Sequence, residues 1–102
     1  FRDVLEHFQN DDDTHAICLI GEIGGPQEAE AAEYIRDHVT KPVVAYVAGL
    51  TAPKGRTMGH AGAIISAFGE SASEKVEILA AAGVAMAENP AVIGATIARV
   101  LQ

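Results

Sequence analysis

The spacing of hydrophobic residues predicts strands and helices in alternation along the chain. Continuous apolar runs at residues 15–21 and 41–49 are typical of strands covered on both faces of a sheet, and a shorter run follows at 83–87. Four further segments have the hydrophobic spacing or end signals of helices. The first, within residues 1–10, has Phe1, Val4, Leu5 and Phe8 on one face; the second has Ala32, Ile35 and Val39; the third runs from Ser71 to Gly83; and the fourth has Ile93, Ile97 and Val100.

Residues at the predicted helix ends support this interpretation. Pro26, after two glycines, starts the second helix and places Glu28 in its first turn. Ser71 and Glu74 have the spacing of a capping box, which opens the third helix. Because strands separated by helices run parallel, the order predicts an α/β fold with a parallel sheet in three layers.

Composition excludes several classes of protein. The 102 residues carry 14 acidic and 7 basic side chains, and the net charge of −7 argues against a nucleic-acid partner. Cys18 is the one cysteine, so it forms no internal disulfide; inside an apolar run it is expected to be a core residue in a reducing compartment. No apolar stretch is long enough to span a membrane and residues 1–8 do not resemble a signal peptide, so we expect a soluble protein, cytoplasmic rather than in the mitochondrial matrix.

Two glycine-containing loops are expected to carry the chemistry. In open α/β sheets, ligands bind beyond the carboxyl ends of the strands, which brings together loops 21–26 and 48–63. The first loop carries Glu22, whose carboxylate either faces this crevice or merely assists the start of the next helix. The second carries His60 within the segment "MGHAGAIIS".

The surroundings of His60 favour a reactive imidazole over an ordinary solvated loop residue. Lys54 and Arg56 concentrate positive charge just before it, and Gly59 and Gly62 would let backbone N–H groups approach an anion. A carboxylate that accepts a hydrogen bond from one ring nitrogen would leave the other nitrogen as a nucleophile, and Glu22 is available for this.

Other candidate sites are weaker. His7, His15 and His38 are expected to be structural or solvated residues. The chain has no paired-histidine or CxxC spacing for a metal, so we predict no metal site. It also has neither a GxxxxGK[ST] phosphate loop nor a GxGxxG motif, which excludes nucleotide binding by those routes.

Three stretches, "GEIGG", "TKPVVAYVAGLTAPKGRTMGHAGAIIS" and "AAGVAMAENPAVIG", resemble the α-subunit family of succinyl-CoA synthetase and malate–CoA ligase over essentially the whole chain. In that family the histidine of GHAGA is phosphorylated during turnover, and the glutamate of GEIGG contacts it. The resemblance therefore implies a phosphohistidine at His60, with Glu22 orienting and stabilising it. The loop around His60 is expected to supply the phosphate-binding set, made of Lys54, Arg56, Gly59, Ala61 and Gly62.

The resemblance implies an acid–thiol ligase with a β-subunit partner. A nucleoside triphosphate bound with Mg²⁺ to an ATP-grasp domain of that partner would phosphorylate His60, and coenzyme A would capture the resulting acyl phosphate. Residues 1–102 would form part of a flavodoxin-like CoA-ligase domain, without the family's N-terminal CoA-binding Rossmann domain. We therefore expect this piece to bind none of these cofactors by its own residues and to be inactive alone.

The substrate acid and the function class leave alternatives open. The segment "SAFGESASEK" replaces the glycine-rich stretch usual in succinate enzymes and resembles malate–CoA ligases more. An ATP-citrate-lyase-like ligase domain is a further alternative, since ATP-citrate lyase shares the GHAGA element too, but its sequence after that motif is less like this one. Succinate or malate and ADP or GDP formation stay undecided at this point. The alternative to an enzyme is a flavodoxin-like module for protein association in which His60 is a loop residue.

Overall fold

The computed structural model describes residues 1–49 and 71–102. In chain order its elements are α1 (Arg2–Gln9), β1 (Ile17–Gly21), α2 (Gln27–His38), β2 (Val43–Val47), α3 (Ala72–Ala81), β3 (Ala85–Met86), the 3₁₀-helix η1 (Pro90–Val92) and α4 (Ile93–Val100). This order confirms the predicted alternation and the α/β fold.

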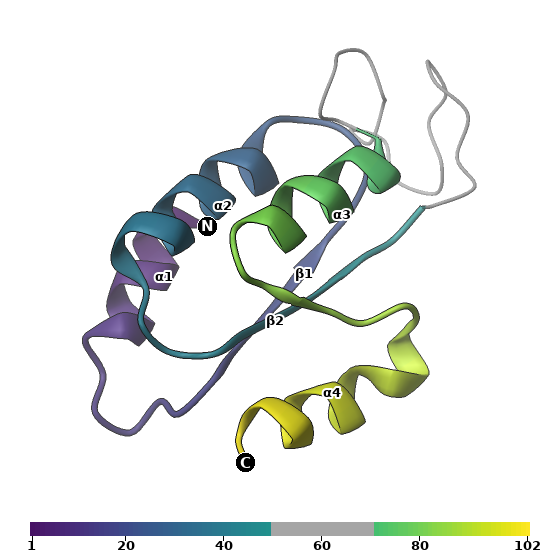
Figure 1. Cartoon of the computed structure of the whole chain (residues 1–102). Helices are drawn as coiled ribbons and strands as arrows, with labels where there is room; N and C mark the ends of the chain where they lie inside the picture. Colours follow the sequence, from purple (N-terminus) through teal and green to yellow (C-terminus); the bar gives the residue numbers. More distant parts are fainter. Residues whose placement is uncertain (50–70) are drawn as a thin grey trace.

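The three strands form one parallel sheet in the order β1-β2-β3, so β2 is central (Figure 1). β1 pairs with β2 in a register that begins at Ile17 with Val43 and ends at Gly21 with Val47. β3 is short and pairs only with the middle of β2, where Val44 faces Ala85. Parallel pairing makes the carboxyl ends of β1 and β2 meet at one edge of the sheet.

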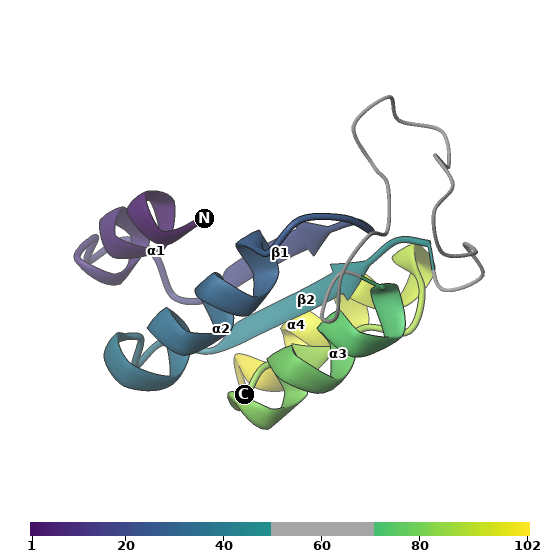
Figure 2. The ribbon, with the colours of Figure 1, turned by 90° about the horizontal axis from the view of Figure 1, so that it is seen from above.

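Helices cover the sheet in layers (Figure 2). α2 contacts both α1 and α3, and α3 also packs on β2. Val43, Val44 and Ala45 of β2 are all buried. Because successive side chains of a strand point to opposite faces, both faces of β2 are covered, and α4 supplies the contacts on the face away from α3. This is the three-layer arrangement that the sequence predicts.

The burial of β1 differs from the expectation. The sequence predicts a strand covered on both faces, but burial alternates along β1, and Cys18 and Ile20 are exposed. Ile17 and Leu19 are buried in the same hydrophobic core as Leu5 of α1 and the inward residues of α2, whereas Cys18 and Ile20, which point to the opposite face, line an open pocket beside α1. The expectation that Cys18 is a core residue is therefore wrong, because an apolar run does not by itself reveal how many faces are covered.

The helical patterns are confirmed, but burial at the two ends of the chain is lower than their spacing suggests. In α1 only Leu5 is buried, and Phe1, Val4 and Phe8 are exposed. In α4 the buried residue is Thr96, whose hydroxyl donates to the Val92 carbonyl oxygen at 2.8 Å. None of the helices within the two described ranges has the length and apolar character needed to cross a bilayer.

The start of α3 confirms the predicted capping box. The Ser71 hydroxyl oxygen accepts a hydrogen bond from the Glu74 backbone N–H at 3.3 Å and donates to the Glu74 carboxylate at 2.6 Å. The helix ends just before Gly83, as predicted. This cap fixes the position at which α3 begins.

Candidate functional site

The carboxyl ends of β1 and β2 bring the first residues of the two predicted loops side by side. Gly21 and Val47 are partners in the ladder, and the Ala48 N–H donates to the Gly21 carbonyl oxygen at 2.9 Å. The chain therefore leaves β1 toward Glu22 beside the point where it leaves β2 toward residue 50. This is the edge at which open α/β sheets bind ligands.

A buried carboxylate from α2 lies directly behind this edge. Glu28 is only 3% exposed, and its Oε2 accepts a hydrogen bond from the Glu22 backbone N–H at 3.0 Å. Gly21 leaves room for it, since a Cβ at that position would lie 2.6 Å from Glu28 Oε2. The last residue of β1 is thus a glycine because the Glu28 carboxylate packs against its backbone.

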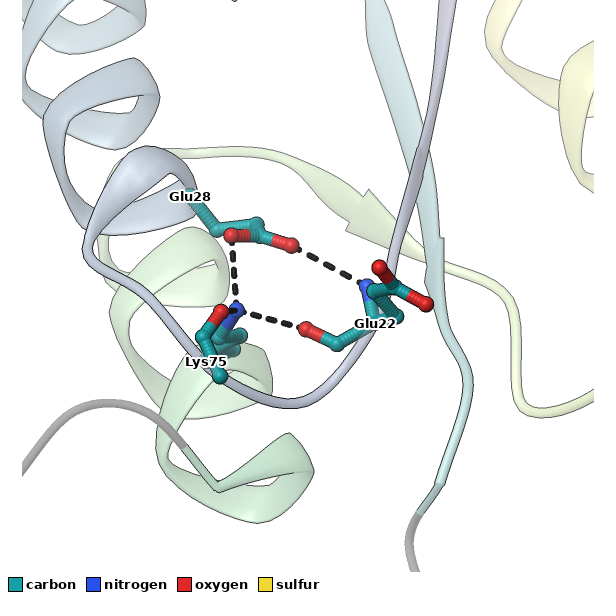
Figure 3. A network of polar contacts seen from close by, with 4 residues as sticks. Glu22, Glu28 and Lys75 are labelled. Carbon is teal, nitrogen blue, oxygen red and sulfur yellow. Dashed lines mark hydrogen bonds and ion pairs between the residues drawn. The ribbon is translucent and has the colours of Figure 1, made fainter. Parts of the chain in front are cut away.

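The partner of this carboxylate is a buried ammonium group from α3. Lys75 is 0% exposed, and its Nζ donates to Glu28 Oε1 at 2.7 Å, to the Glu22 carbonyl oxygen at 2.5 Å and to the Gly24 carbonyl oxygen at 2.7 Å (Figure 3). An ammonium group has three hydrogens to donate, so its capacity is met. Burial of the pair is tolerable only because these hydrogen bonds replace water.

The loop that this pair holds has an unusual backbone. Gly24 and Gly25 have φ angles of 86° and 75°, in the region that glycine adopts without strain. This turn brings the Gly24 carbonyl oxygen back to Lys75 before α2 begins. The double glycine that the sequence shows before Pro26 is therefore needed to fold residues 22–25 around the Lys75 ammonium group.

A pocket of about 460 Å³ opens on the outer side of this loop. Its walls come from the end of β1, the Glu22 loop, the start of α2, the residue before α1 and the first residue after β2, namely Phe1, Ile20, Gly21, Glu22, Gly24, Gln27, Glu28 and Ala48. Glu22 is exposed, and Figure 3 shows its carboxylate pointing away from Glu28 and Lys75. The Glu22 carboxylate thus lies at the sheet edge, and the Glu22 backbone is bound behind it.

Some of the other residues considered for the site lie among the described residues, and some do not. His60, the proposed nucleophile, and the phosphate-binding set of Lys54, Arg56, Gly59, Ala61 and Gly62 lie outside the described residues. His7, His15 and His38 are exposed, as expected. The His38 ring lies 4.8 Å from the Tyr34 ring between centroids. Within residues 1–49 and 71–102 no group of three His, Cys, Asp or Glu side chains could hold a metal ion.

Lys75 is not among the residues predicted from the sequence, and Glu28 is predicted only as an acid in the first turn of a helix. Both residues lie on the inward stripes of their helices: Glu28 precedes Ala31, Ala32 and Ile35 on α2, and Lys75 lies between Ala72 and Leu79 on α3. The sequence does contain a signal for the burial of Glu28 and Lys75, since each charged residue is spaced three or four positions from buried apolar residues of its own helix. Two opposite charges on inward helix faces indicate a buried pair.

Comparisons with known proteins agree with this architecture. A family described as CoA-ligase matches residues 1–85. The chain is 57% identical over 101 residues to the malate–CoA ligase subunit alpha of Methylorubrum extorquens. It is 56% identical over 101 residues to the ADP-forming succinate–CoA ligase subunit alpha of Aquifex aeolicus. These alignments cover 99% of the chain but 34% and 33% of the two relatives, so the chain spans about a third of their length.

Solved structures show the same fold. An ATP citrate lyase of Methanosaeta concilii, a mutant in complex with (3S)-citryl-CoA, superposes with a TM-score of 0.85 at 27% identity, over 95% of this chain and 17% of that one. The ATP citrate lyase of Methanothrix soehngenii in complex with citrate and coenzyme A gives the same TM-score and identity. Since the family match covers most of the chain and includes the complete Glu22 loop and its buried ion pair, the chain belongs to the CoA-ligase family.

Proposed function

We propose that this chain is part of the α-subunit of a nucleotide-dependent acid–CoA ligase that works through a phosphohistidine at His60. The observation that carries the proposal is the convergence of the Glu22 loop and the start of the His60 segment at one sheet edge. The Ala48 N–H bonds to the Gly21 carbonyl oxygen, so these segments depart side by side. Family membership and the α-subunit relatives support the same conclusion.

The reaction divides into three displacements. An imidazole nitrogen of His60 attacks the γ-phosphorus of a nucleoside triphosphate, and the nucleoside diphosphate leaves. A carboxylate oxygen of the substrate acid then takes the phosphoryl group as the P–N bond breaks, which gives an acyl phosphate. Finally the thiolate of coenzyme A attacks the acyl carbon, and phosphate leaves. A covalent intermediate replaces one difficult step with easier ones.

Glu22 assists the first two steps in this proposal. Its carboxylate accepts the hydrogen bond of the second imidazole nitrogen, which selects the tautomer with the reactive nitrogen directed at phosphorus. It also stabilises the positive charge that develops on the ring as the P–N bond forms. Lys54 and Arg56, with the backbone N–H groups of Gly59, Ala61 and Gly62, neutralise and hold the phosphoryl group.

The remaining components belong to other parts of the assembly. Residues 1–102 form part of a flavodoxin-like ligase domain, and the CoA-binding domain lies elsewhere in the same subunit. A β-subunit with an ATP-grasp domain binds the nucleotide and its Mg²⁺ in this proposal, as the resemblance to the α-subunit family implies. The relatives are named as alpha subunits, and one is named as ADP-forming, which supports a second subunit and a nucleotide.

The substrate is a four-carbon dicarboxylic acid in this proposal. The chain is 57% and 56% identical to malate and succinate enzymes but 27% identical to ATP citrate lyases, which favours malate or succinate over citrate. Malate is our first choice because of the "SAFGESASEK" segment at residues 66–75.

The test uses the full-length protein with its β-partner. NTP-dependent formation of malyl-CoA or succinyl-CoA is expected, and it should be lost in a His60→Asn variant that still assembles. Assembly without any acyl-CoA formation from either acid would favour the alternative, a non-catalytic interaction module.

A further inference from the structure

The backbone of Glu22 is held by charged side chains on both sides of its Cα. Its N–H donates to Glu28 Oε2 at 3.0 Å, and its carbonyl oxygen accepts from Lys75 Nζ at 2.5 Å. Lys75 and Glu28 also pair with each other at 2.7 Å, which closes a ring of contacts (Figure 3). One charge-assisted hydrogen bond therefore lies on each side of the Glu22 Cα. Together these two bonds fix the direction in which the Glu22 side chain leaves the backbone.

The pair joins three segments that are distant in sequence. Lys75 belongs to the first turns of α3, the helix that follows residues 50–70; Glu28 begins α2; and Glu22 and Gly24 lie in the loop between β1 and α2. α3 is itself anchored at Ser71 by its capping box. The Glu22 loop is thus tied both to its own helix and to the helix after the His60 segment.

Stability alone is a poor explanation for a buried ion pair at this place. Replacing such a pair with neutral side chains of similar size is often neutral or stabilising, because the cost of removing two charges from water disappears. Lys75 also directs two of its three hydrogen bonds to backbone carbonyl oxygens of the Glu22 loop rather than to its ion-pair partner. The arrangement is suited to fixing a loop more than to strengthening the core.

We propose that Lys75 and Glu28 are positioning residues: they hold the backbone of residues 22–24 so that the Glu22 carboxylate is aimed at its reaction partner. This inference rests on the proposed function, in which that partner is His60. Neither residue touches the phosphoryl group; both act through Glu22.

The experiment measures the rate of phosphoryl transfer from NTP to His60 in the complete α/β enzyme, below the unfolding temperature of every variant. Three variants are compared with wild type: Lys75→Met, Glu28→Gln and the double variant. The single changes leave one buried charge without its partner and should lower both the urea midpoint and the rate. The double variant removes both charges, so its urea midpoint should lie above those of the single variants, but below wild type because the Glu22 and Gly24 carbonyl oxygens lose their donor. Its rate should stay at least about 10-fold low, because the methionine that replaces Lys75 cannot bind these carbonyl oxygens and hold the loop.

A matched control is available at the opposite end of the sheet. Lys41 precedes β2 and donates from Nζ to the carbonyl oxygens of Phe8 and Asp11, so it too binds backbone carbonyls of a loop. Lys41→Met should lower the urea midpoint without changing the rate of phosphoryl transfer. The KM for the nucleotide should be unchanged in all variants, because the nucleotide binds to the partner subunit.

A double-mutant cycle separates positioning from general destabilisation. If Lys75 acts through Glu22, Lys75→Met should slow the reaction by less than about 2-fold when Glu22 is already Gln. The inference is overturned if the Lys75→Met/Glu28→Gln protein reacts at the wild-type rate, or if Lys75→Met costs as much in the Glu22→Gln background as in wild type. A wild-type rate for Glu22→Gln itself would overturn the role of Glu22 in the proposed function as well.

Discussion

At the scale of single residues, Gly21 shows how closely the site is packed. A methyl group there would lie 2.6 Å from Glu28 Oε2 and 3.0 Å from its Cγ, and the carboxylate is already held by Lys75. We expect Gly21→Ala to lower the free energy of unfolding by about 1–3 kcal/mol, as other overpacking substitutions do. Urea unfolding of the full-length protein measures this.

Gly94 in α4 provides the control for that substitution. A Cβ at Gly94 meets nothing within 4 Å, so Gly94→Ala should raise the free energy of unfolding by about 0.5–1 kcal/mol, since alanine favours helix. Equal effects of the two substitutions would contradict the tight contact between Gly21 and Glu28.

Asp11 allows a prediction about pH. The pKa of its carboxyl group is lowered below 3.8, chiefly because the Thr14 hydroxyl donates to it at 2.7 Å and then because the Asp13 N–H does so at 3.1 Å. A lowered pKa means that the ionised group stabilises the turn above pH 3.8 and that this contribution is lost as the pH falls through the lowered value. Thr14→Val should raise the Asp11 pKa toward 3.8, as measured by an NMR titration of the carboxyl carbon. An unchanged pKa would show that the Thr14 hydroxyl does not set it.

At the scale of elements, the cap of α3 can be tested directly. Ser71→Ala removes the side chain that accepts the Glu74 N–H, and we expect a loss of about 1 kcal/mol in the free energy of unfolding. Ser73, exposed in the same helix, is the matched control, and Ser73→Ala should have little effect. If the two variants unfold at the same urea concentration, the cap contributes no stability.

The elements themselves could largely be predicted from the sequence, because local signals define them. Pro26 and the Ser71 capping box marked helix starts, and the apolar run before Gly21 marked β1. The exposure of individual side chains could not be predicted from such local signals. Cys18 lies in an apolar run, yet its burial depends on whether another element covers that face of β1, which local sequence does not encode.

Only part of the candidate site could be predicted, because some of its residues follow a local pattern and others meet through tertiary packing. Glu22 could be placed at the sheet edge because a strand end followed by glycines is a local pattern. Lys75 could not be connected to it, since the two residues are 53 positions apart and their contact depends on how α3 packs against α2.

At the scale of the whole molecule, the chain has about a third of the length of its relatives. We therefore expect the 102-residue chain alone to form no acyl-CoA, because the proposed function assigns CoA binding and nucleotide binding to other parts of the assembly. Purified chain is assayed with NTP, Mg²⁺, coenzyme A and either acid. Turnover above that of a His60→Asn control would disprove the expected dependence on the other parts.

The complete enzyme should use malate at least as well as succinate. The prediction rests on the proposed preference for malate, for which the segment "SAFGESASEK" at residues 66–75 is the reason. The comparison of kcat/KM for the two acids decides it, and a large preference for succinate would remove the malate assignment.

The most direct measurement for the whole account is the phosphorylation of the α-subunit in the assembled α/β enzyme, after incubation with Mg²⁺ and labelled NTP. The account predicts an acid-labile, base-stable label in the wild type and none in His60→Asn. Glu22→Gln keeps the size of the side chain but removes its charge, so labelling should slow by roughly 10²-fold. Label that survives the loss of His60, or a wild-type labelling rate in Glu22→Gln, would contradict the pairing of these two residues.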